Sequence, residues 1–138
     1  MSYLGIDFGK KRIGLAISAS GVIARGYVTL AFSNCDDIIS RILGICAKEK
    51  VEKIILGLPK LKSGADSPQT ISVRKFKDLL RAKTNLPIVF VDEYLSSHEA
   101  EEMLKSSNPK ITKDRRKMRE QIDQVAAQVI LEQYFKSR

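Results

Sequence analysis

The sequence contains no tryptophan, one histidine (His98) and two cysteines, Cys35 and Cys46. Two cysteines cannot build a disulfide scaffold, and a single histidine excludes zinc sites that need two. No apolar run is long enough to cross a membrane, and the first residues lack the basic and apolar regions of a signal peptide. We therefore expect a protein of the reducing cytoplasm that has no membrane partner.

The length of 138 residues predicts one domain that spans residues 1–138. The 43% hydrophobic and 29% charged fractions are typical of a globular chain. Lysine and arginine number 24 against 16 aspartate and glutamate, which gives a formal net charge of +8. This excess predicts a polyanionic partner such as nucleic acid, but it does not say whether that partner is bound or cut.

Hydrophobic periodicity predicts an α/β fold. An antiparallel meander of three strands is expected at residues 3–8, 13–18 and 22–30, with a hairpin turn at residues 9–11. The remaining elements are a helix capped by Asn34, a strand at 53–58, a helix that starts at Ser67-Pro68, a strand at 88–91, a short helix after Ser96 and a last helix that ends near Phe135. The apolar strand at 88–91 is expected to be buried on both faces. This order predicts a five-stranded mixed sheet, in which two parallel strands follow the meander, with helices on both faces.

Two catalytic motifs are not supported. Residues 5–10 resemble a phosphate-binding P-loop, but only three residues separate the glycines and Lys11 stands where that motif has Ser or Thr. Ser97 and His98 could form a nucleophilic dyad, but the helix cap predicted at Ser96 already accounts for these serines.

Three acidic positions are harder to explain as ordinary surface charges. Asp7 interrupts a strand pattern, where aspartate is uncommon. Strand alternation places Asp7 opposite its apolar neighbours, on the face of Gly5 and Gly9, and we expect these glycines to leave open space around its carboxylate. Asp92 and Glu93 end the 88–91 strand at its carboxyl edge, where open α/β sheets place their sites.

Asp123 lies at the border of the apolar stripe of the last helix, beside Ala126 and Ala127. These small residues should allow the helix to approach the sheet closely.

Each acid also has a simpler explanation. Asp7 could pair with Lys10 or Arg12, Glu93 could be solvated, and Asp123 could pair with Arg119 one turn away. Three carboxylates that meet at one point, however, would repel one another unless cations bound there, and carboxylates suit Mg²⁺ or Mn²⁺. We therefore expect Asp7, Glu93 and Asp123 to form a metal site, with Asp92 as the second choice.

Four spaced motifs resemble those of the YqgF (RuvX) family of bacterial ribonuclease H-like proteins. They are Ile6-Asp7-Phe8-Gly9-Lys10-Lys11-Arg12-Ile13-Gly14-Leu15-Ala16, Leu56-Gly57-Leu58-Pro59, Asp92-Glu93 with Leu95-Ser96-Ser97, and Ile122-Asp123-Gln124-Val125-Ala126-Ala127. The similarity covers essentially the whole chain, in order. It implies an RNase H-like nuclease domain in which Asp7, Glu93 and Asp123 are the catalytic and metal-binding acids. The family's implied roles are processing of the 5′ end of the 16S ribosomal RNA precursor, in ribosome biogenesis, or Holliday junction resolution, in DNA recombination and repair.

The resulting hypothesis is phosphodiester hydrolysis with two Mg²⁺ or Mn²⁺ ions about 4 Å apart. Asp7 would bridge both ions, Glu93 would hold one and Asp123 would complete the other. Basic residues beside these acids would bind phosphates on either side of the scissile bond. The predicted phosphate-binding residues are Lys10, Lys11, Arg12, Lys113, Arg115, Arg116, Lys117 and Arg119.

Two positions depart from the family pattern. Tyr94 stands where the family usually has arginine, and Leu61 where it usually has asparagine, so the substrate contacts of those residues are not carried over. Three other classes stay open: a nucleic-acid-binding module without catalysis, a sugar-kinase or actin-like ATPase, and a helper within a larger RNA–protein assembly. The substrate would be an RNA precursor or branched DNA, and the protein a monomer or, for junction resolution, a two-fold homodimer.

Overall fold

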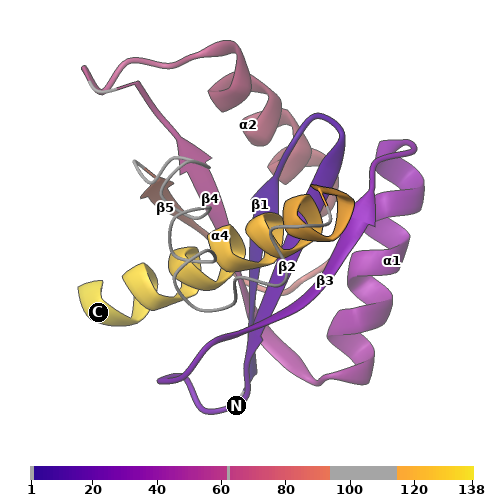
Figure 1. The fold of residues 1–138 in the computed structure, drawn as a ribbon. Helices are drawn as coiled ribbons and strands as arrows, with labels where there is room; N and C mark the ends of the chain where they lie inside the picture. Colours follow the sequence, from indigo (N-terminus) through magenta and orange to yellow (C-terminus); the bar gives the residue numbers. More distant parts are fainter. Residues whose placement is uncertain (1, 62, 94–114) are drawn as a thin grey trace.

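The computed structural model describes residues 2–61, 63–93 and 115–138 (Figure 1). The described elements are β1 (Ser2–Phe8), β2 (Arg12–Ser18), β3 (Arg25–Ala31), α1 (Cys35–Lys48), β4 (Val51–Pro59), α2 (Pro68–Arg81), β5 (Ile88–Glu93) and α4 (Arg115–Ser137). The five strands form one sheet in the order β3-β2-β1-β4-β5. The first three strands pair antiparallel, and β4 runs parallel to both β1 and β5. The predicted α/β class and mixed sheet are therefore confirmed.

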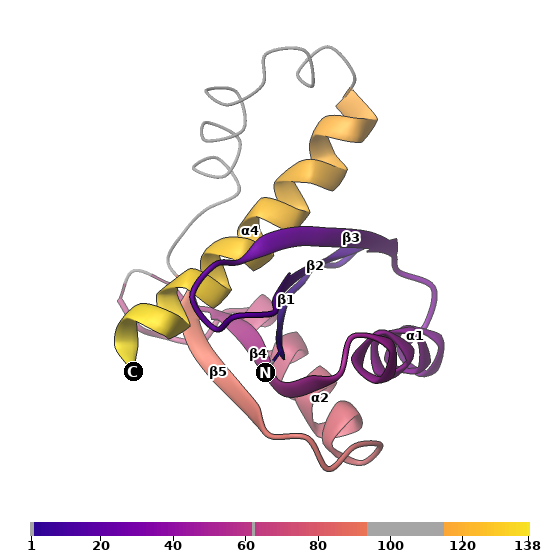
Figure 2. The ribbon, with the colours of Figure 1, turned by 90° about the horizontal axis from the view of Figure 1, so that it is seen from below.

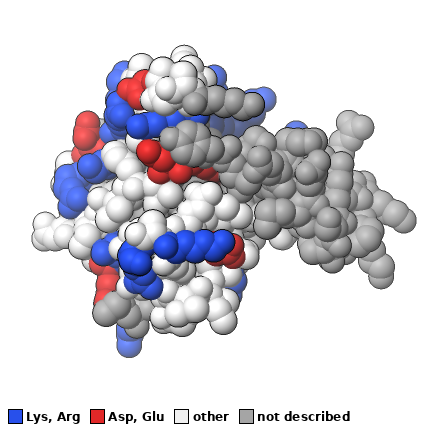
Figure 3. All heavy atoms as spheres, turned by 90° about the vertical axis from the view of Figure 1, so that its left-hand side faces the viewer, with Lys and Arg blue, Asp and Glu red and all other residues white. Residues whose placement is uncertain are grey.

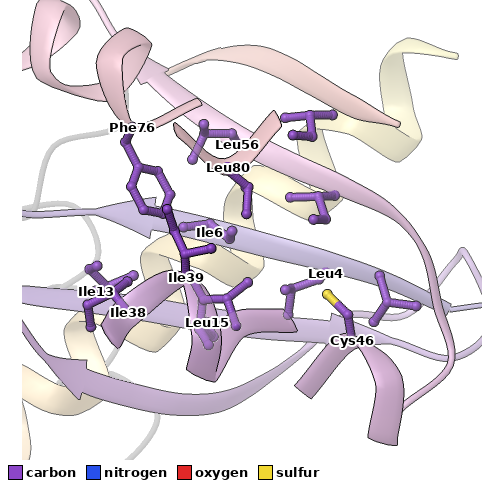
Figure 4. Close-up of a cluster of buried hydrophobic side chains, with 14 of the residues drawn as sticks. Leu4, Ile6, Ile13, Leu15, Ile38, Ile39, Cys46, Leu56, Phe76 and Leu80 are labelled. Atoms are coloured by element: carbon purple, nitrogen blue, oxygen red, sulfur yellow. The ribbon is translucent and has the colours of Figure 1, made fainter. Parts of the chain in front are cut away.

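Helices cover both faces of the sheet, as predicted. α4 crosses one face, while α1 and α2 pack against the other (Figure 2). The alternation of β1 explains this division, because Leu4 and Ile6 point into the core under α1 and α2 while Tyr3 packs under α4. The larger core joins side chains of all five strands to α1 and α2, with Phe76 and Leu80 at its α2 side (Figure 4).

Local sequence signals start two of the helices. The Asn34 side chain accepts a hydrogen bond from the Asp37 amide at the start of α1. Ser67 and Thr70 form a reciprocal capping box at the start of α2, with Pro68 in the first turn. The Thr70 hydroxyl also donates to the Pro59 carbonyl, which ties the start of α2 to the end of β4.

Two sequence expectations about strands were wrong. The third strand begins at Arg25 rather than at residue 22, because the Ser20 hydroxyl accepts the amides of Val22 and Ile23 and holds them in a turn. β5 is not buried on both faces: it pairs only with β4 among the described strands, and its residues 89–91 are half-buried. The strands buried on both faces are the interior ones, β1, β2 and β4, because each lies between two other strands and helices cover both sides of the sheet.

The short helix predicted after Ser96, together with Tyr94 and His98, lies outside the described residues. Within the described part of the chain, no helix combines the length and apolar character that crossing a bilayer requires.

Candidate active site

Asp7 lies near the end of β1, on the face covered by α4. In the β1–β2 ladder it is directly opposite Gly14. The open space expected around Asp7 is present on one side only: Asp7 lines a hollow, whereas α4 fills the space over Gly5. A Cβ atom on Gly5 would lie 2.6 Å from Leu131 Cγ and 2.8 Å from the Ala127 carbonyl oxygen. Gly5 thus permits close packing of the helix on the sheet.

Gly14 brings Asp123 to the same place. A Cβ atom on Gly14 would lie 2.0 Å from the Asp123 carbonyl oxygen, so only glycine allows α4 to rest on β2 at this point. The Thr29 hydroxyl donates a 2.6 Å hydrogen bond to the Glu120 carbonyl and holds the same turn of α4 against β3. Since Gly14 faces Asp7, the approach of α4 places Asp123 beside Asp7.

Glu93 completes the acidic group from the end of β5, where it pairs in register with Pro59 of β4. It is not a solvated strand-end carboxylate, since its residue is only 9% exposed. Gly57 makes room for it, because a Cβ atom on Gly57 would lie 2.9 Å from Glu93 Oε2. The glycine of the Gly-Leu-Pro motif therefore accommodates an acidic side chain of the neighbouring strand.

The three acids line one hollow of about 490 Å³, which we call the acid pocket. The β1–β2 turn and the first turn of α2 form its rim. Its lining residues are Asp7, Phe8, Gly9, Lys10, Lys11, Arg12, Pro59, Gln69, Glu93, Asp123 and Ala126.

Burial and mutual repulsion make these acids hard to ionise. Burial, reinforced by the charge of Asp123, raises the pKa of Asp7 to about 7. Burial, reinforced by Asp7, raises the pKa of Glu93 to about 9. Burial also raises the pKa of Asp123, although Arg12 opposes that change. Positive charge placed beside such acids favours their ionised forms.

Arg12 supplies part of that charge. Its Nε donates to Asp123 Oδ2 at 2.7 Å, between side chains that are 33% and 16% exposed. The simpler explanations from the sequence pair Arg12 with Asp7, and Arg119 with Asp123. The structure instead joins Arg12 of β2 to Asp123 of α4, and so links two of the four sequence motifs.

The other predicted site residues lie at different distances from the acid pocket. Lys10 and Lys11 are exposed on its rim. Arg116, Lys117 and Arg119 are exposed on the first turns of α4. Asp92 is 49% exposed and forms a 3.7 Å ion pair with Lys60, outside the pocket lining.

Lys113 and the Arg115 side chain lie outside the described residues. On the face shown in Figure 3, acidic side chains lie directly beside a band of basic ones.

The donor set of the acid pocket fits a hard divalent cation. Within residues 2–61, 63–93 and 115–138, no three acidic, histidine or cysteine side chains are arranged to hold a single ion. Mg²⁺ does not require three, because it is commonly held by one or two carboxylates together with waters and substrate phosphates. Asp7 and Glu93 meet that requirement, while Asp123 is engaged by Arg12.

Sequence reasoning missed Gln69. Its side-chain amide donates to the Phe8 carbonyl at 2.7 Å, so it joins the start of α2 to the end of β1 within the pocket lining. Its position just after Pro68 in a helix start does not distinguish it from an ordinary surface glutamine. Only the capping contact between α2 and β4 brings it to this place.

Comparison with known proteins gives concordant results. The family model described as "RuvX: Holliday junction resolvase" matches residues 1–137. A relative from Chloroflexus aggregans, named "Putative pre-16S rRNA nuclease", is 38% identical over 136 residues, which cover 98% of this chain and 93% of the relative. A relative of the same name from Methylobacillus flagellatus is 41% identical over 133 residues, covering 96% of this chain and 88% of the relative.

Solved structures share the fold. The RuvC protein of T. thermophilus in complex with a Holliday junction substrate matches with a TM-score of 0.58 and 14% identity, covering 99% of this chain and 96% of its own. The fowlpox virus Holliday junction resolvase matches with a TM-score of 0.57 and 16% identity, covering all of both chains. At these identities the likeness concerns the fold alone, and it confirms the RNase H-like architecture that the sequence predicted.

Proposed function

Because this chain belongs to the RuvX family of nucleases, we propose that it hydrolyses phosphodiester bonds with a divalent metal ion and processes the 5′ end of the 16S ribosomal RNA precursor. The observation that carries this proposal is the meeting of Asp7, Glu93 and Asp123, from three separate elements, in a pocket rimmed by lysines. A binding module would need the lysines but not buried carboxylates that oppose one another's ionisation. The names of the relatives point to the 16S ribosomal RNA precursor.

The three acids would hold the metal, with Asp7 and Glu93 as the first ligands and Asp123 joining them once its carboxylate leaves Arg12. When bound, Mg²⁺ or Mn²⁺ supplies an acidified water and neutralises charge on the phosphate. The carboxylates keep their ligand oxygens in place through rigid elements, because Asp7 and Glu93 lie at strand ends and Asp123 is packed on Gly14.

The exposed lysines of the β1–β2 turn would position the substrate. Lys10 and Lys11 lie within a few residues of Asp7 and line the same pocket. Two ammonium groups at the rim attract the phosphates that flank the scissile bond without reading the base sequence. Helix α4 extends the basic surface with Arg116 and Lys117.

Holliday junction resolution is the second candidate. The description of the matching family model, a Holliday junction resolvase, favours it. A resolvase must cut two symmetric strands, so this function requires a two-fold dimer with two acid pockets.

One assay separates these functions. Purified protein is incubated with an RNA spanning the 5′ end of the 16S precursor and, in parallel, with a four-way DNA junction, each with Mg²⁺, Mn²⁺ or EDTA. We expect metal-dependent cleavage of the RNA. Preferential cleavage of the junction by a dimer would favour the second candidate, and binding without cleavage of either would refute the nuclease proposal.

Single substitutions then test the acids. Asp7→Asn and Glu93→Gln should each lower cleavage about a hundredfold or more, because metal ligation is worth several kcal/mol of transition-state stabilisation. Asp92→Asn is the matched control, since this neighbour of Glu93 is exposed and paired with Lys60. Equal losses in Asp92→Asn and Glu93→Gln would contradict the assignment.

A further inference from the structure

A second hollow adjoins the acid pocket, and we propose that it receives one unpaired nucleobase of the nucleic acid that the enzyme cuts. This inference rests on the proposed nuclease function. The hollow measures about 370 Å³ and shares Phe8, Gly9, Lys10 and Gln69 with the acid pocket. We call it the aromatic pocket; the lining residues that matter here are Phe8, Phe32, Phe76, Leu79, Lys10 and Lys75.

Three phenylalanine rings build its wall. Phe8 stacks on Phe76 with centroids 4.5 Å apart and an interplanar angle of 29°. Phe32 meets Phe8 edge-on at 6.0 Å and 87°. Phe76 is buried, whereas Phe8 and Phe32 are half-buried and so keep ring surface available to a ligand. Fixed aromatic surfaces of this kind bind bases of any sequence by stacking.

An exposed leucine extends the apolar surface. Leu79 of α2 lines the aromatic pocket and is 46% exposed, although folding gains little from an apolar side chain left in water. A volume of about 370 Å³ also lies within the roughly 300–1,000 Å³ range typical of sites for small organic groups. Both observations fit a small ligand with apolar surface.

Charge at the mouth identifies the ligand as part of a polyanion. Lys10 and Lys75 are exposed on opposite elements, the β1–β2 turn and α2. An apolar peptide offers no negative charge to pair with these lysines. A nucleotide within a strand does, because a phosphate lies on each side of its sugar. Gln69 adds a hydrogen-bonding group: its amide nitrogen donates to the Phe8 carbonyl, and its side-chain oxygen, which accepts from none of the described residues, can accept from a base edge.

The base must be unpaired. A base within a duplex is stacked on both faces and paired along its edge, so only a splayed nucleotide can place a ring among aromatic side chains. Because the two pockets share a wall, the bound base would lie close to the scissile phosphate. The enzyme would then select single-stranded or frayed segments at the cleaved bond.

The test measures binding in EDTA, where cleavage does not interfere. The probes are a fluorescent ten-nucleotide single-stranded RNA, the same chain with abasic sites, and a blunt duplex. Wild type is compared with Phe32→Leu, which removes a ring but keeps apolar volume, and with Leu79→Glu. The matched control is Ile71→Glu, since Ile71 lies on the same helix at 50% exposure and outside the aromatic pocket.

We expect wild type and Ile71→Glu to bind the intact single strand about tenfold more tightly than the abasic chain. Phe32→Leu should lose that preference while binding the abasic chain as wild type does. Leu79→Glu should weaken binding of the single strand more than Ile71→Glu does. Equal binding of intact and abasic chains by wild type, or equal behaviour of Leu79→Glu and Ile71→Glu, would overturn the proposal. So would a dimer of the wild type that Leu79→Glu dissociates, because the pocket would then belong to a second copy.

Failure of this inference can be told apart from failure of the nuclease proposal. If the wild-type protein prefers intact bases but never cleaves, the base-binding proposal stands and the nuclease proposal is refuted. If it cleaves with metal while wild type and all variants bind the probes alike, the nuclease proposal stands and the base-binding proposal is refuted.

Discussion

Asp7→Asn should stabilise the metal-free protein at alkaline pH, even though it should abolish activity. Burial and the neighbouring Asp123 raise the pKa of Asp7 from 3.8 to about 7 in the folded protein. At 1.36 kcal/mol per pKa unit, ionised Asp7 costs the folded state at most about 4 kcal/mol. The asparagine amide avoids this cost, but burying it with incomplete hydrogen bonding costs about 1–3 kcal/mol. We therefore expect a net gain of about 2 kcal/mol in the free energy of unfolding at pH 8.

The sign of the pH dependence follows from linkage. Well below pH 3.8, the ordinary pKa of this carboxyl, Asp7 is protonated in both the folded and the unfolded state, so its ionisation costs nothing. As the pH rises, the unfolded chain loses this proton first, and the folded state is penalised progressively until about pH 7. At pH 5 the penalty is about 2 kcal/mol, less than half its full size, so the gain from Asp7→Asn should be close to zero there.

Urea unfolding followed by circular dichroism, in EDTA at pH 5 and pH 8, measures both values. Asp92→Asn is the control: Asp92 is 49% exposed, so its loss should change stability by no more than about 0.5 kcal/mol at either pH. The quantity to compare is the gain in free energy of unfolding of Asp7→Asn over wild type at each pH. If this gain were no larger at pH 8 than at pH 5, the argument that burial and mutual repulsion disfavour ionised Asp7 would be wrong. Added Mg²⁺ should stabilise wild type more than Asp7→Asn, because the variant lacks a ligand.

Two further predictions concern the approach of α4 and the ion pair beside it. Gly14→Ala should destabilise the fold by about 1–3 kcal/mol or more in urea unfolding, since its Cβ would lie 2.0 Å from the Asp123 carbonyl oxygen. Gly44→Ala, whose Cβ would meet nothing within 4 Å in α1, should instead stabilise it by about 0.5–1 kcal/mol, and the same sign in both variants would contradict the packing argument. Arg12→Gln should bind Mn²⁺ about tenfold more tightly in calorimetry without nucleic acid, because Asp123 loses its 2.7 Å partner. Lys10→Gln removes the same charge without breaking that pair and should change the affinity less; equal effects would rule out competition by Arg12.

Several elements of this protein follow from local sequence. Alternation in residues 3–8 separates the apolar face that α1 and α2 cover from the face of Asp7, and the caps at Asn34 and Ser67 start α1 and α2 where the sequence predicts. These signals are local, since they depend on side chains a few residues apart. The error at β5 has the opposite origin: an apolar run does not reveal which strand lies at an edge, because burial depends on the order of strands in the sheet.

The acids themselves were predictable, because aspartate in a strand and acids at a strand end are unusual in a sequence. Their surroundings were not. The glycines at positions 5, 14 and 57 each look like flexible positions in the sequence, and only the packing shows that they allow α4 to approach and Glu93 to turn inward. The partner of Arg12 was equally hidden, since Asp123 lies 111 residues away.

The sequence by itself determined the types of element, the family resemblance and the three acids, because those depend on residue chemistry and short spacing. The tertiary structure decided which groups meet. It placed Asp123 over Gly14, joined Arg12 to that carboxylate, and set an aromatic pocket against the acid pocket. Such contacts arise from the crossing of α4 and the docking of α2 on the sheet, and no local pattern encodes the distance between elements so far apart in the chain.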